Sequence, residues 1–132
     1  MKPEQLRDLV RYRMEQASET LAEAVLLRDA GACRGAVNRA YYAMFYALLG
    51  LLASRQLGTS KHSGAIAMFD REFVRTGTFP PGFSQALHRA FRRRQLHDYG
   101  EVVRADIDAA NESIADAEGF VAAIASYLAS QG

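Results

Sequence analysis

Near the end of the sequence, apolar residues recur at alternating intervals of three and four positions, which is the spacing of one face of an α-helix. A stripe of this length needs other helices to cover it, because an isolated helix would leave it in contact with water. We therefore predict a long helix over roughly residues 104–130 that packs into a helical bundle. The stripe consists of Ile107, Ala110, Ile114, Ala117, Val121, Ile124 and Leu128.

The rest of the sequence also favours helices, since it contains no alternating β-branched run bounded by turn residues. Gly31 and the Pro80-Pro81-Gly82 loop separate helical segments, because glycine ends helices and consecutive prolines cannot continue one. We expect an all-α, up-and-down bundle of about five helices that forms a single domain over residues 1–132. The four preceding helices are predicted over roughly residues 3–30, 32–56, 60–74 and 83–98, with Ser60 as the N-cap of the third.

The apolar run at residues 40–53 does not predict a membrane segment. It is shorter than the roughly 17–25 residues that a bilayer requires, and Arg39 and Arg55 bracket it. It predicts a central helix surrounded by protein. The single cysteine, Cys33, allows no disulfide framework, and the charged residues 1–10 lack the apolar stretch of a signal peptide. We therefore expect a cytoplasmic protein with no membrane association.

The formal net charge of +1 argues against a protein that binds nucleic acid through diffuse positive charge. Any such contact must come from local patches. Residues 88–97 contain four arginines, two histidines and no acid, whereas residues 106–118 contain five acids and no Lys or Arg. These runs are either solvated helix faces or the two halves of a self-complementary dimer surface.

The basic patch continues into residues 92–99, which combine side chains able to cleave RNA without a metal ion. The guanidinium of Arg92 suits a phosphate, the imidazole of His97 can move protons near neutral pH, and the phenol of Tyr99 can accept a modifying group. The simpler interpretation is a solvated basic helix end that interacts favourably with the helix dipole. No metal or cofactor is expected, since no Glu-x-x-His pair supplies the inward ligands of a metal-carboxylate bundle.

Four sequence blocks follow one another in the middle of the chain. They are NRAYYAMFY at residues 38–46, KHSG at 61–64, FDREFVRTG at 69–77 and an RAF, RQ and DYG pattern within 89–100. Together these blocks resemble the HEPN superfamily (higher eukaryotes and prokaryotes nucleotide-binding domain), in particular its UPF0332-like subfamily. The resemblance implies an α-helical bundle that commonly dimerises.

Many HEPN proteins have an RNA-cleaving site with the pattern Arg, four to six residues, His. The resemblance implies that this chain has such a site. Arg92 and His97 fit this pattern as catalytic residues. Tyr99 completes the form found in toxins that pair with a minimal nucleotidyltransferase antitoxin, which would adenylylate this tyrosine and block the site. Members of the subfamily closest to these blocks often lack the histidine. The alternative is therefore a non-catalytic nucleotide-binding or docking partner of a nucleotidyltransferase, and the third hypothesis is a purely structural helical dimer.

Helix geometry indicates that one chain holds only half of such a site. Arg92 and His97 lie five residues apart, which corresponds to about 140° around an ideal helix, whereas Arg93 shares a face with His97. The pair would therefore share a face only if the helix distorted near its end. A two-fold axis that brings two copies of this helix together would gather both pairs in one cleft. We therefore predict a composite RNA site in a homodimer.

Other polar side chains are expected to support this site or the fold. Arg93 and Arg94 would position RNA or pair with acidic residues, and Asp98 would orient the histidine or end the helix. His62 and His88 are expected to be structural or surface residues.

Overall fold

The computed structural model describes residues 1–59, 61–98 and 106–131, except for the side chains at positions 97 and 98. This part of the chain forms five α-helices and contains no strand, which confirms the predicted all-α fold. A π-helical turn directly follows the third helix. The elements are α1 (Pro3–Asp29), α2 (Cys33–Ser54), α3 (His62–Phe69), η1 (Asp70–Val74), α4 (Pro81–Asp98) and α5 (Ile107–Gln131).

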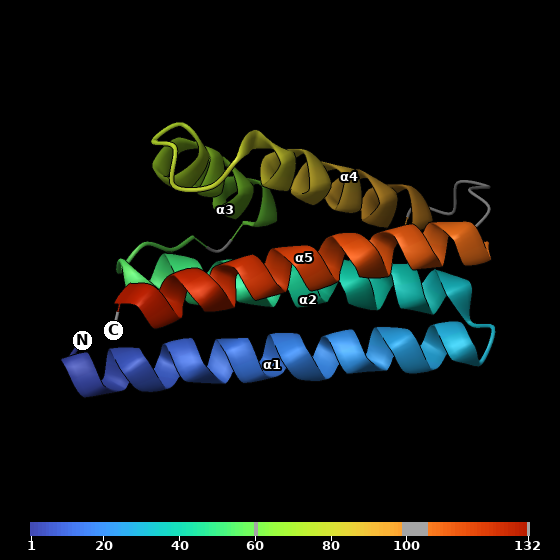
Figure 1. Ribbon diagram of the computed structural model, residues 1–132, viewed down its shortest axis with the longest axis horizontal. Helices are drawn as coiled ribbons and strands as arrows, with labels where there is room; N and C mark the ends of the chain where they lie inside the picture. The colour runs from blue at the N-terminus through green and yellow to red at the C-terminus, as the bar shows by residue number, and fades with distance from the viewer. Residues whose placement is uncertain (60, 99–105, 132) are drawn as a thin grey trace.

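The long helix α2 is the centre of the bundle. It contacts α1, α3, α4 and α5. Figure 1 shows α1 on one side of α2 and α5, with α3 and α4 on the other side. Residues 40–53 are buried or half-buried throughout, so the predicted central helix surrounded by protein is confirmed. None of the helices in the described ranges combines the length and apolar content that a membrane crossing requires.

An aromatic cluster fixes the beginning of α4 against α5. Phe69 and Phe73 have no exposed surface, and Phe120 of α5 is 1% exposed. The ring centroid of Phe69 lies 5.6 Å from that of Phe79 and 5.4 Å from that of Phe120. Aromatic rings at these separations attract one another in addition to burying apolar surface. The loop before α4 is therefore held in place by Phe79, which is 5% exposed.

The sequence prediction was wrong in one detail of this region and incomplete in another. α4 begins at Pro81, two residues before the predicted start. The φ angle of proline suits the first helical turn, and proline loses no hydrogen bond there because the N–H groups of that turn have no acceptor within the helix. The third helical segment does reach Val74, but its end is the π-helical turn η1. The predicted N-cap Ser60 lies outside the described residues, and α3 begins at His62.

Candidate functional site on α4

The predicted basic patch lies on α4, which packs against α2 and α5 (Figure 1). The buried face of this helix carries Ala86, Leu87 and Ala90. The side chains beside that face meet neighbouring helices, whereas those opposite it meet solvent. The four arginines of α4 therefore have different surroundings.

Two of these arginines pair with acidic residues of α5. Nη2 of Arg93 lies 2.7 Å from Oε1 of Glu112, and Nη1 donates to Oγ of Ser113 at 3.1 Å. Nη2 of Arg89 lies 3.2 Å from Oδ2 of Asp116. The basic and acidic runs of the sequence are therefore joined within one chain. Of the two roles predicted for Arg93, the structure shows the pairing with acidic residues.

Arg94 connects α4 to the NRAYYAMFY segment of α2. Its Cζ lies 5.6 Å from the ring centroid of Tyr41 and 5.5 Å from that of Tyr42, which are cation–π distances. The hydroxyl of Tyr41 lies 2.7 Å from Nδ1 of His62, and the ring of His62 stacks on Phe45 with centroids 3.9 Å apart. Of the two roles expected for His62, structural or surface residue, these contacts indicate the structural one.

Burial controls the protonation of Tyr41 and His62. Burial raises the pKa of the Tyr41 hydroxyl well above its ordinary value, against the opposing charge of Arg94. Burial also lowers the pKa of the His62 imidazole, and the positive charge of Arg94 lowers it further. Both shifts favour a neutral pair in which the Tyr41 hydroxyl donates to the unprotonated Nδ1 of His62.

This pair should make stability depend on pH. Unfolded His62 binds a proton near pH 6.5, whereas its folded pKa is lower. The unfolded state therefore binds more protons in this window, and the free energy of unfolding falls as pH decreases from about 6.5 towards the folded pKa. We expect a His62→Asn protein, whose amide oxygen can still accept from Tyr41, to lose part of this dependence. Urea unfolding of the wild-type and His62→Asn proteins at pH values above and below this window measures the pH dependence. An equal pH dependence of the free energy of unfolding in the two proteins would contradict the prediction.

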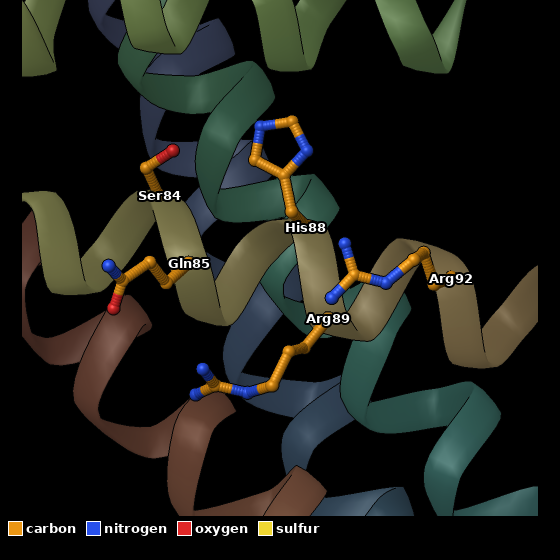
Figure 2. A pocket seen from close by; sticks show the side chains of 5 residues that line it. All are labelled: Ser84, Gln85, His88, Arg89 and Arg92. Carbon is orange, nitrogen blue, oxygen red and sulfur yellow. The ribbon is translucent and has the colours of Figure 1, made fainter.

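Arg92 differs from the other three arginines of α4. It is exposed, and no ion pair or hydrogen bond joins it to another described residue. It lines a surface hollow of about 370 Å³ with Ser84, Gln85, His88 and Arg89. Figure 2 shows the guanidinium of Arg92 turned back along the helix towards His88, whereas Arg89 points away towards α5. Arg92 and His88 share a helix face because they lie four residues apart.

Asp70 of η1 holds two side chains of this hollow. Its Oδ1 accepts a hydrogen bond from the hydroxyl of Ser84 at 2.6 Å, and its Oδ2 lies 2.7 Å from Nε2 of His88. The His88 side chain is 45% exposed, so the oriented imidazole remains accessible to a ligand. The sequence prediction treated His88 as a structural or surface residue. The four-residue spacing between His88 and Arg92 is the sequence feature that could have identified this candidate site.

The remaining predicted site residues lie at the end of α4 or beyond it. α4 remains α-helical to Asp98, so no distortion before that residue brings Arg92 and His97 onto one face. The side chains of His97 and Asp98, and Tyr99 as a whole, lie outside the described residues. Their roles stay predictions. Within the described ranges, no three His, Cys, Asp or Glu side chains gather as a metal site would require.

Comparisons with known proteins agree on one family. The sequence pattern of the HEPN domain matches residues 10–127. A "UPF0332 protein" of Thermotoga maritima is 40% identical over 116 residues, which cover 88% of each chain. A protein of Methanocaldococcus jannaschii named "Putative toxin MJ0142" is 31% identical over 90 residues, which cover 68% of this chain and 61% of that protein.

One solved structure supports the fold independently of close sequence similarity. The crystal structure of TT1696 from Thermus thermophilus matches with a TM-score of 0.74 at 21% identity. The match covers 89% of this chain and 96% of that chain. The two proteins therefore share the helical fold.

Proposed function

Because the chain belongs to the HEPN family, we propose that it is a metal-independent endoribonuclease and the toxin of a toxin–antitoxin pair. The name of the similar Methanocaldococcus jannaschii protein, which includes the word toxin, supports the second part of this proposal. The Arg92 and His97 pattern supports the first part. The proposed substrate is RNA.

The exposed guanidinium of Arg92 is the observation that carries the proposal. Arg89 and Arg93 pair with carboxylates of α5, whereas no described carboxylate pairs with Arg92. A guanidinium stays charged at every physiological pH, and its planar fork fits two phosphate oxygens. Arg92 is therefore available to bind a phosphate of RNA.

In the proposed reaction, the ribose 2′-OH attacks the neighbouring phosphorus and the bond to the 5′-oxygen breaks. A base takes the 2′-OH proton, and an acid protonates the leaving 5′-oxygen. Arg92 stabilises the additional negative charge that develops on the phosphorane. His97 provides one of the two proton transfers. The products are a 2′,3′-cyclic phosphate and a free 5′-OH.

The proposed site forms between two copies of the chain. Arg92 and His97 lie about 140° apart on α4, so one copy does not direct both side chains at the same phosphate. A two-fold axis near the end of α4 would bring Arg92 of one copy towards His97 of the partner subunit. The exposure of Leu96, an apolar residue of α4 with 43% of its surface accessible, supports a contact in this region.

The proposed antitoxin is a minimal nucleotidyltransferase that transfers AMP to Tyr99. Tyr99 follows His97 by two residues, so the added nucleotide would lie near the end of α4. Its negative charge would compete with the phosphate of RNA for Arg92. Modification would therefore neutralise the toxin without degrading it.

Expression of the protein in a host cell tests this function. Wild type and an Arg11→Ala control, which removes an exposed arginine of α1, are expected to stop growth and fragment RNA. Arg92→Ala protein should do neither, because it lacks the phosphate ligand. Co-expression of the nucleotidyltransferase should restore growth with wild type but not with Tyr99→Phe protein. Normal growth with intact RNA in every strain would instead favour the non-catalytic nucleotide-binding or docking partner.

A further inference from the structure

The proposed reaction needs two proton-transfer groups at one phosphate, and each copy of the chain contributes a single His97. His88 is a second imidazole on α4, and it lines the same hollow as Arg92. The two residues are one helical turn apart, where side chains of a helix are neighbours. The surroundings of His88 therefore decide whether it can act on a phosphate that Arg92 holds.

Asp70 gives the imidazole of His88 a fixed orientation. The carboxylate lies 2.7 Å from Nε2 of His88, while its other oxygen accepts a hydrogen bond from Ser84. A carboxylate in this position selects the tautomer that carries its proton on Nε2, which leaves the lone pair on Nδ1. An imidazole oriented in this way by a neighbouring carboxylate is the arrangement of a general base.

The second ring nitrogen of His88 lies on the side of the ring nearer Arg92 (Figure 2). The hollow between these side chains has a volume of about 370 Å³, at the lower end of the range for ligand pockets. A nucleotide phosphate with its ribose is a ligand of that size. A phosphate bound by Arg92 would therefore share this hollow with the exposed Nδ1 side of His88.

We propose that His88 is the general base of RNA cleavage, with Asp70 as its positioning residue and Arg92 as the phosphate ligand; this inference rests on the proposed endoribonuclease function. Nδ1 of His88 takes the proton of the 2′-OH, the O2′–P bond forms and the P–O5′ bond breaks. The leaving 5′-oxygen takes a proton from the partner's His97. Exchange with water then returns both imidazoles to their starting states.

The acid must come from the second copy because of the spacing along α4. His88 and His97 are nine residues apart, which corresponds to about 13.5 Å along a helix and to opposite faces. One copy cannot direct both imidazoles at the same phosphate. The inference therefore agrees with the proposed two-fold site and gives each histidine a separate role.

The experiment separates this role from a structural contact between η1 and α4. In a His88→Gln protein, the amide can still donate to Asp70, but it cannot accept a proton near neutral pH. We expect it to unfold at the wild-type temperature and to cleave RNA at least about 100-fold more slowly. Asp70→Asn protein should lose kcat with little change in KM. His62→Gln, the same change outside the hollow, should keep the cleavage rate.

A substrate with sulfur in place of the leaving 5′-oxygen distinguishes the base from the acid. The thiolate leaves without a proton, so it should restore cleavage by His97→Ala protein but not by His88→Gln protein. If the His88→Gln protein cleaved RNA at the wild-type rate, the inference would be overturned. An inactive Arg92→Ala protein would in that case still support the proposed function. Rescue of His88→Gln by sulfur would also overturn the role as base. Wild-type protein that leaves RNA intact would overturn the proposed function itself.

Discussion

A mixture of Arg92→Ala and His97→Ala proteins is expected to cleave RNA, although neither protein does so alone. Each single variant should lose roughly 10²- to 10⁴-fold in cleavage rate, the usual contribution of a group that transfers protons or stabilises charge. In a mixed dimer, the shared cleft keeps Arg92 of one copy and His97 of the other. One complete pair therefore remains. Cleavage of labelled RNA after co-refolding of the two proteins measures the recovery.

A matched control uses the same mixing procedure without creating an intact site. The Arg92→Ala protein is mixed with a protein that carries both substitutions, and this mixture should remain inactive. Sedimentation of each sample confirms that mixed dimers have formed. An inactive mixture despite mixed dimers, or full wild-type activity in a verified monomer, would rule out the composite site.

Replacement of Phe69 by alanine should lower the free energy of unfolding by roughly 3–5 kcal/mol, the range for truncating a fully buried phenylalanine. Phe69 has no exposed surface, and its ring lies between those of Phe73, Phe79 and Phe120. The loss of the ring leaves a cavity in this aromatic cluster, which also holds the start of α4. A loss of this size is a large share of the roughly 5–15 kcal/mol that stabilises a typical domain. Urea unfolding provides the measurement.

Tyr12→Ala is the control for this prediction, because Tyr12 is an aromatic residue of α1 with 56% of its surface exposed. Its loss should change the free energy of unfolding by no more than about 0.5 kcal/mol. Similar losses for Tyr12→Ala and Phe69→Ala proteins would show that the cluster does not dominate stability.

The helices were predictable because burial imposes a period on the sequence. The middle of the predicted stripe in α5 is buried, as Ile114, Ala117 and Ile124 show. The first residue of the stripe, Ile107, is 50% exposed and is the first residue of α5. The start of α4 at Pro81 was missed because the same residue that stops a helix also fits its first turn.

The contacts of the site were harder to predict, since they join residues that are distant in the sequence. Spacing alone made Arg93 the natural neighbour of His97, but the structure pairs Arg93 with Glu112 of α5. The contact between Asp70 and His88 spans 18 positions and joins the first residue of η1 to α4. The periodicity of a single helix does not predict a contact between two different elements.

The ion pairs between α4 and α5 have a consequence for the thermodynamics of the proposed RNA binding. A cation that is already neutralised inside the protein displaces no condensed counterion when RNA arrives. Arg89 and Arg93 are engaged in this way, so among the described arginines of α4 their contribution to counterion release should be small. Each phosphate contact on single-stranded nucleic acid adds about 0.7 to the slope of log affinity against log salt concentration. The affinity of α4 for the proposed RNA substrate should therefore depend on salt less than its four arginines suggest, and Arg92 should contribute to the dependence that remains.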